Sequence, residues 1–164
     1  MKKYFLFLIL FIHTVFAANN PDAAIMNARL GLAYLSKNLY TNSKRCLLIA
    51  LREDSRIPET WYSMAYFLEK TNHLRAANSY YQKAIKINPH SGAARNNYGA
   101  FLCRQHQFAN AIQEFVLATR EPNYLHSASA YRNAAICASR IPNEKLAEYF
   151  FKKARENDPG LAYS

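Results

Sequence analysis

Residues 58–89 read PETWYSMAYFLEKTNHLRAANSYYQKAIKINP, and this stretch decides the fold. Apolar and small side chains recur in it at the three- and four-residue spacing of one helix face. They are Trp61, Met64, Ala65 and Leu68 in the first run, and Ala77, Tyr81, Ala84 and Ile85 in the second. The polar residues Thr71–His73 separate the two runs, and Pro89 stops the second one. The stretch therefore predicts two short amphipathic helices joined by a polar turn.

The same pattern recurs along the chain at intervals of about 34 residues, the period of one helix-turn-helix repeat. One downstream copy contains Tyr98, Gly99, Ala111, Phe115 and Ala118. The next contains Tyr131, Ala134, Ala135, Ala147, Phe151, Ala154 and Pro159. An upstream copy is degenerate and contains Leu30, Gly31, Tyr34, Leu47 and Ala50, with Ser43 in place of its first packing alanine. A chance match would not recur in this way.

This alternation of aromatic, glycine and alanine positions resembles the tetratricopeptide repeat. We therefore predict an all-α, right-handed superhelical solenoid of four helix-turn-helix repeats. The expected repeats are 24–57, 58–91, 92–125 and 126–159, in a domain that spans 19–159 and precedes a tail at 160–164. Phe115 and Phe151 are both expected in the core, and Gly99 is expected where another helix comes close.

The N-terminus is of a different kind from the repeats. Lys2 and Lys3 precede an almost wholly apolar run, Tyr4–Phe16, and small residues follow it. This predicts a secretory signal peptide over 1–18, cleaved after Ala17 or Ala18. The alternative is an uncleaved anchor, although the run is shorter than the roughly 20 residues that span a bilayer. We expect an exported, periplasmic protein, associated with the outer membrane. A lipid anchor is not predicted, because no cysteine lies near the cleavage position.

Export predicts that two of the three cysteines form a disulfide, because thiols pair in an oxidising compartment. Cys103 and Cys137 fall on the first helices of successive repeats, which stack side by side, so they are the pair best placed for a disulfide. Cys46 falls on a second helix and is expected to be a small buried hydrophobe. A thiol enzyme built on Cys46 is the remaining alternative, but no basic activator stands at a defined spacing from it.

No other pattern in the sequence indicates chemistry. The histidines and cysteines form no pair at metal-ligand spacing, and no catalytic triad order or phosphate-binding glycine loop is present. The formal net charge is +10, but the basic residues are scattered over the helix faces. We therefore predict a protein that is not an enzyme and has no cofactor, no metal, no small-molecule substrate and no nucleic-acid partner.

The first helices of such a superhelix line its concave surface, which is suited to holding a peptide segment. Tyrosines and arginines are typical anchors of such surfaces. The side chains predicted there are Tyr62, Tyr66, Glu69, Asn96, Ala100, Arg104, Ser129, Arg132 and Ile136. For each of them, solvated surface or packing between repeats is the alternative. The last repeat is not followed by a covering helix, which favours self-association or partner docking at that end.

Two segments resemble one family more closely. Asn96–Gln105, with Phe108 and Ala111 after it, is similar to the most recognisable stretch of the type IV pilus biogenesis proteins PilW and PilF. Arg132–Cys137, with Ala147 and Phe151 after it, resembles the next repeat of that family. The two cysteines fall on matching positions, which supports their pairing.

The resemblance implies a non-enzymatic periplasmic scaffold that assists type IV pilus biogenesis through secretin assembly or outer-membrane localisation. Its partner would then be the outer-membrane secretin or another pilus component. The alternative is a tetratricopeptide-repeat adaptor for another envelope or secretion complex. Pull-down with a variant altered at Tyr66 and Arg104 would separate the two functions.

Overall fold

The computed structural model describes residues 19–158 and residue 160. The predicted signal peptide and Pro159 lie outside the described residues, as does 161–164 of the tail. The helices in the described part are α1 (Pro21–Ser36), α2 (Tyr40–Glu53), α3 (Pro58–Lys70), α4 (Leu74–Ile87), α5 (Gly92–Arg104), α6 (Phe108–Thr119), α7 (Ser127–Ala138) and α8 (Glu144–Asn157). No strand occurs within residues 19–158, which confirms the all-α fold.

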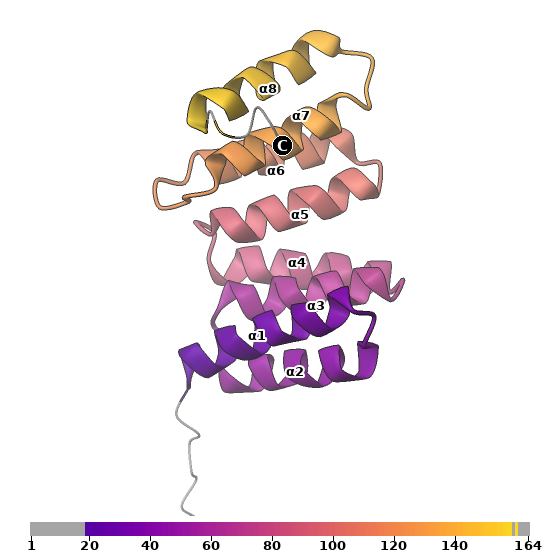
Figure 1. Cartoon of the computed structure of the whole chain (residues 1–164), viewed down its shortest axis with the longest axis vertical. Coiled ribbons are helices and arrows are strands. Elements are labelled where there is room, and N and C mark those ends of the chain that lie inside the picture. The colour runs from indigo at the N-terminus through magenta and orange to yellow at the C-terminus, as the bar shows by residue number, and fades with distance from the viewer. Residues whose placement is uncertain (1–18, 159, 161–164) are drawn as a thin grey trace, which may run out of the picture.

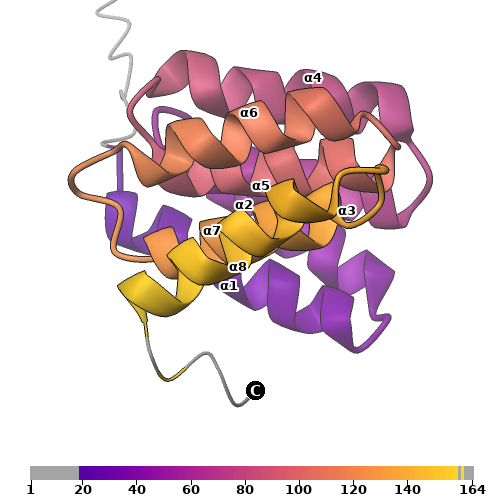
Figure 2. The same ribbon diagram turned by 90° about the horizontal axis from the view of Figure 1, so that it is seen from above.

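Each odd-numbered helix packs against the even-numbered helix that follows it, and the resulting hairpins stack into one elongated body (Figure 1). Within this body the first helices of successive hairpins contact one another, from α1 to α3, α3 to α5 and α5 to α7. Viewed along the stack, the hairpins are rotated relative to one another, as expected for a solenoid (Figure 2). The first helices therefore form one continuous surface, which we call the first-helix face.

The helix ends follow local sequence signals. Asn20, Ser91 and Asn143 each accept a hydrogen bond from the first turn of the helix that follows, and Pro58 starts α3. Inside the first three hairpins the turn has only three residues, and its middle residue is left-handed. These residues are Asn38, Asn72 and His106, with φ of 58°, 62° and 61°. Asparagine tolerates this conformation better than most residues.

The core follows the predicted alternation of large and small residues. Tyr81 and Phe115 are 1% exposed, and the tyrosine ring lies 5.1 Å from that of Phe101 on the next hairpin. A Cβ added at Gly99 would lie 2.9 Å from the Phe115 ring and 3.0 Å from the carbonyl oxygen of Ala111. Gly99 is thus where α5 and α6 approach closely, as predicted, because no larger residue fits there without displacement.

One core prediction is wrong. Phe151 is 37% exposed, whereas its neighbour Phe150 is 4% exposed and packs against Tyr131 with ring centroids 6.5 Å apart. In the second repeat the equivalent aromatic, Tyr81, is covered partly by Phe101 of the following hairpin. α8 is the last helix described, and in the structure it presents Phe151 and Tyr149 to solvent. The repeat spacing therefore identified a position whose burial depends on a following repeat.

The segment that connects the first two hairpins contains an ion pair. Asp54 is 3% exposed and accepts hydrogen bonds from the Arg56 backbone N–H at 2.9 Å and from its guanidinium at 3.0 and 2.8 Å. These bonds lower the pKa of the Asp54 carboxyl below its usual value. The carboxylate form is thus favoured by the fold.

This pair predicts an acid-sensitive contribution to stability. Because the folded-state pKa of Asp54 is lowered, its contribution is present above the unfolded-state pKa, about 4, and is lost as the pH falls through the folded value. At pH 7 the Asp54→Asn variant should unfold at a lower urea concentration than the wild type, and this difference should shrink toward pH 3. Urea titrations followed by circular dichroism measure it. A gap that stays constant over this range would contradict the assignment.

Candidate functional site

The nine side chains predicted for the groove all lie on the first-helix face. Three come from each of α3, α5 and α7. The structure therefore brings them to one surface, but it gives them different environments. The exposed members are Arg104, Arg132 and Ile136, and the partly buried ones are Tyr62, Tyr66, Glu69, Asn96, Ala100 and Ser129.

Glu69 belongs to a contact between repeats rather than to an open groove. Its side chain is 8% exposed and forms an ion pair with Arg104 on the next hairpin. The Tyr81 hydroxyl donates a hydrogen bond to the same carboxylate at 3.2 Å. Although burial lowers the pKa of Arg104, its hydrogen bond to Glu69 raises it above the usual value. Arg104 also lies over the Tyr66 ring, 5.9 Å from its centroid.

Two further predicted residues are also engaged within the solenoid. The Asn133 amide donates to the side-chain oxygen of Asn96 at 3.0 Å and so joins α7 to α5. Tyr62 packs against the core, and its burial, with the nearby charge of Glu59 adding to it, raises the pKa of its hydroxyl. Much of the predicted surface thus fixes the spacing of the repeats and leaves a smaller part free to meet a partner.

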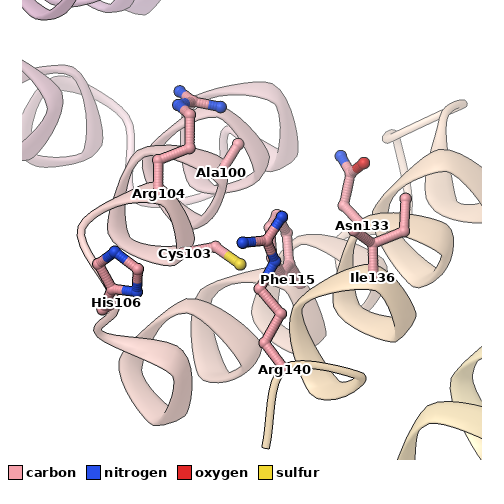
Figure 3. A pocket seen from close by; sticks show the side chains of 8 residues that line it. All are labelled: Ala100, Cys103, Arg104, His106, Phe115, Asn133, Ile136 and Arg140. Atoms are coloured by element: carbon pink, nitrogen blue, oxygen red, sulfur yellow. The ribbon is translucent and has the colours of Figure 1, made fainter.

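The free part includes a pocket of about 260 Å³ between α5 and α7 (Figure 3). Its apolar lining residues are Ala100, Cys103, Phe115 and Ile136. Its polar lining residues are Arg104, His106, Asn133 and Arg140. The guanidinium of Arg140 points in among the other labelled side chains. We call this cavity the α5–α7 pocket.

The α5–α7 pocket follows from the length of one connection. Four residues, 54–57 and 88–91, join the earlier hairpins, whereas 120–126 joins α6 to α7. With this longer joint, α7 packs on the preceding hairpin mainly through α6 and touches α5 much less. The space that results between the two first helices is the pocket. Burial raises the pKa of Tyr124, which lies in this joint against Gly92, to about 12.

Sequence reasoning missed His106, Asn133 and Arg140. Arg140 continues the α7 stripe that the prediction ended at Ile136, four residues earlier, and that helical spacing could have revealed it. It lies beyond the end of α7, in a turn longer than those of the other hairpins. His106 gave no signal by spacing, because it stands in a turn and not on a helix face.

The structure joins Cys103 and Cys137 in a disulfide with a Cα–Cα distance of 5.8 Å. The bond links α5 to α7 beside the pocket. Cys46 is buried and unpaired. Among the described residues, no helix is long and apolar enough to cross a membrane. No group of metal-binding side chains occurs there either.

Comparison with known proteins places these features in a family. Residues 58–91 and residues 80–113 each match a model described as tetratricopeptide repeat. An uncharacterized protein of Haemophilus influenzae is 31% identical over 140 residues, which cover 85% of this chain and 78% of that protein. The type IV pilus assembly protein PilF of Pseudomonas aeruginosa is 24% identical over 137 residues, 82% of this chain.

Solved structures with a similar fold include two type IV pilus proteins. The structure of PilW, a type IV pilus biogenesis factor, has a TM-score of 0.76 and 25% identity over 85% of this chain. That of Pseudomonas PilF has a TM-score of 0.76 and 22% identity over 84% of this chain. The chain spans 54% of the Pseudomonas PilF sequence and 64% of the PilW chain. These matches indicate no catalytic family. The chain is therefore a tetratricopeptide-repeat protein that belongs to one family with the Haemophilus protein and is related to the type IV pilus proteins PilF and PilW.

Proposed function

We propose that this protein is a non-enzymatic scaffold that assists type IV pilus biogenesis from the periplasm. In this role it holds a segment of the outer-membrane secretin, or of another pilus component, against its first-helix face. The observation that carries the proposal is a continuous helical surface with exposed arginines and an open pocket, in a chain related to PilF and PilW. The predicted signal peptide supports the periplasmic location.

The geometry of the α5–α7 pocket favours a bound polypeptide segment over a small molecule. The α5–α7 pocket, at about 260 Å³, is smaller than the roughly 300–1,000 Å³ of typical small-molecule sites. It is open along a surface built from several helices, so an extended segment could run over it and insert a side chain. A structural neighbour with a TM-score of 0.63, YrrB, is described as having an unusual peptide-binding site. That description supports peptide binding on a stack of this kind.

Crosslinking in living cells tests the proposal. A photo-crosslinking amino acid replaces Arg132, which is exposed on the first-helix face and forms no ion pair within the described residues. After irradiation we expect a covalent adduct with the secretin or another pilus component, identified by mass spectrometry. The matched control carries the same amino acid at Ser79, which is exposed on α4. It should give little or none of this adduct.

The outcomes separate the two functions considered from the sequence. An adduct at position 132 with a protein of a different envelope or secretion complex would support the adaptor function and overturn the pilus assignment. Equal adducts from positions 132 and 79 would contradict a partner on the first-helix face. A deletion strain that keeps its surface pili and its secretin multimers would also count against the proposal.

A further inference from the structure

Arg140 brings a positive charge to the α5–α7 pocket that no carboxylate of the described residues pairs with. Arg104 and His106 also line the pocket, and none of its lining residues is acidic. Arg104 is already paired with Glu69. Arg140 and His106 take part in none of the ion pairs formed by the described residues. A carboxylate entering the pocket would therefore meet an unpaired guanidinium, a strong partner for it.

Apart from Asn133, the other residues that line the pocket are apolar. They are Ala100, Cys103, Phe115 and Ile136, of which Ile136 is 44% exposed. An exposed isoleucine beside a cavity gains from being covered by another apolar group. Basic and apolar side chains thus lie close together around the pocket (Figure 3).

The turn that supplies His106 differs from the two earlier turns in its middle residue. In the first two hairpins the left-handed middle residue of the turn is asparagine, at positions 38 and 72. The third hairpin has histidine there, with φ of 61°, and histidine also tolerates this conformation. What distinguishes His106 is that its imidazole lines the pocket.

We propose that the α5–α7 pocket is the recognition site for an acidic side chain, aspartate or glutamate, that stands two residues from an aliphatic side chain in an extended segment of the partner, so that both point to the same side. Arg140 and His106 receive the carboxylate, and Ala100 and Ile136 receive the aliphatic side chain. The disulfide fixes the α5 and α7 sides of the pocket relative to each other, because it joins α5 to α7 there. This inference rests on the proposed function, since it specifies the segment that the first-helix face holds.

The test uses the whole purified chain, labelled with ¹⁵N, and two peptides followed by NMR titration. Both peptides are acetylated and amidated, with a leucine in a glycine–serine background; one has glutamate two residues from the leucine, on the same side of an extended chain, and the other has glutamine there. We expect the glutamate peptide to shift the amide signals of α5 and α7 and to bind at least fivefold more tightly than the glutamine peptide, as a charge-assisted hydrogen bond would require. The Arg140→Gln variant should lose this preference.

A matched variant controls for overall charge. Arg155→Gln removes the same charge from an exposed position on α8, outside the pocket, and should bind the glutamate peptide within twofold of the wild type. Circular dichroism verifies that both variants are folded. Equal binding of the two peptides, or equal weakening by the two substitutions, would overturn the proposal.

Two further probes distinguish other anions. Inorganic phosphate that competes with the glutamate peptide at similar concentration would indicate a general anion site and overturn recognition of a segment. A peptide with a free C-terminus and no acidic side chain that binds as well would assign the pocket to a chain end instead. Failure of these titrations alongside a successful crosslink from position 132 would remove this inference and leave the proposed function standing.

Discussion

The Phe115→Ala variant is expected to lose about 3 to 5 kcal/mol of its free energy of unfolding, the usual cost of emptying a buried aromatic site. Phe115 is 1% exposed and lies against Gly99, where α5 and α6 come closest. The backbones are already in close contact there, so they cannot move together to fill the space. A domain of this size is stable by only about 5 to 15 kcal/mol. Urea unfolding followed by circular dichroism should therefore show a much lower midpoint.

The chain supplies a matched control for this loss. Phe151→Ala removes the same atoms from the corresponding position of the last repeat, but this side chain is 37% exposed. Its substitution should cost about 1 kcal/mol, the central value for point variants. If the two variants unfold at the same urea concentration, this would contradict the assignment of Phe115 to the core and of Phe151 to the surface.

Removal of the disulfide is the second large effect. Cys103 and Cys137 are 34 residues apart, and closing a loop of that length should stabilise the fold by about 3 to 4 kcal/mol through the entropy of the unfolded chain. The Cys103→Ser, Cys137→Ser double variant should lose this amount. Reduced wild-type protein should behave in the same way. Thermal or urea unfolding of the oxidised and reduced forms measures the difference.

Cys46 provides the comparison for this experiment. It is buried and unpaired, so Cys46→Ala leaves the disulfide intact and makes only a small packing change. This variant should keep the gap between its oxidised and reduced forms. Oxidised and reduced wild-type proteins that unfold at the same point would contradict the contribution of the disulfide.

The fold was predictable because its core depends on local spacing. The small residues Ala77, Ala111 and Ala147 occupy the same position of successive hairpins and are all buried. Phe151 departs from this pattern because its position can depend on more than its own hairpin: Tyr81, at the same position of the second repeat, also packs against Phe101 of the following hairpin. A repeat pattern describes the interior of a stack accurately and its last unit less well.

The site was predictable only in part, because contacts between hairpins decide which of its side chains are free. Helical spacing placed Glu69 and Arg104 on the correct face. It could not show that they pair with each other across hairpins, which takes Glu69 out of the open surface. It also could not reveal the α5–α7 pocket, which depends on how a longer joint shifts α7 toward α6. Such effects depend on three-dimensional placement between repeats.

The disulfide also makes the C-terminal half of the stack stiffer than the N-terminal half. It clamps the third and fourth hairpins, whereas within the described residues only non-covalent contacts hold the first two hairpins together and to the third. Bending of the long axis should therefore concentrate in the N-terminal half, where adjacent hairpins can slide and tilt at lower energy. A partner that applies force along the stack would therefore distort α1–α4 first. The geometry of the disulfide-linked hairpins, and of the pocket between them, would change less.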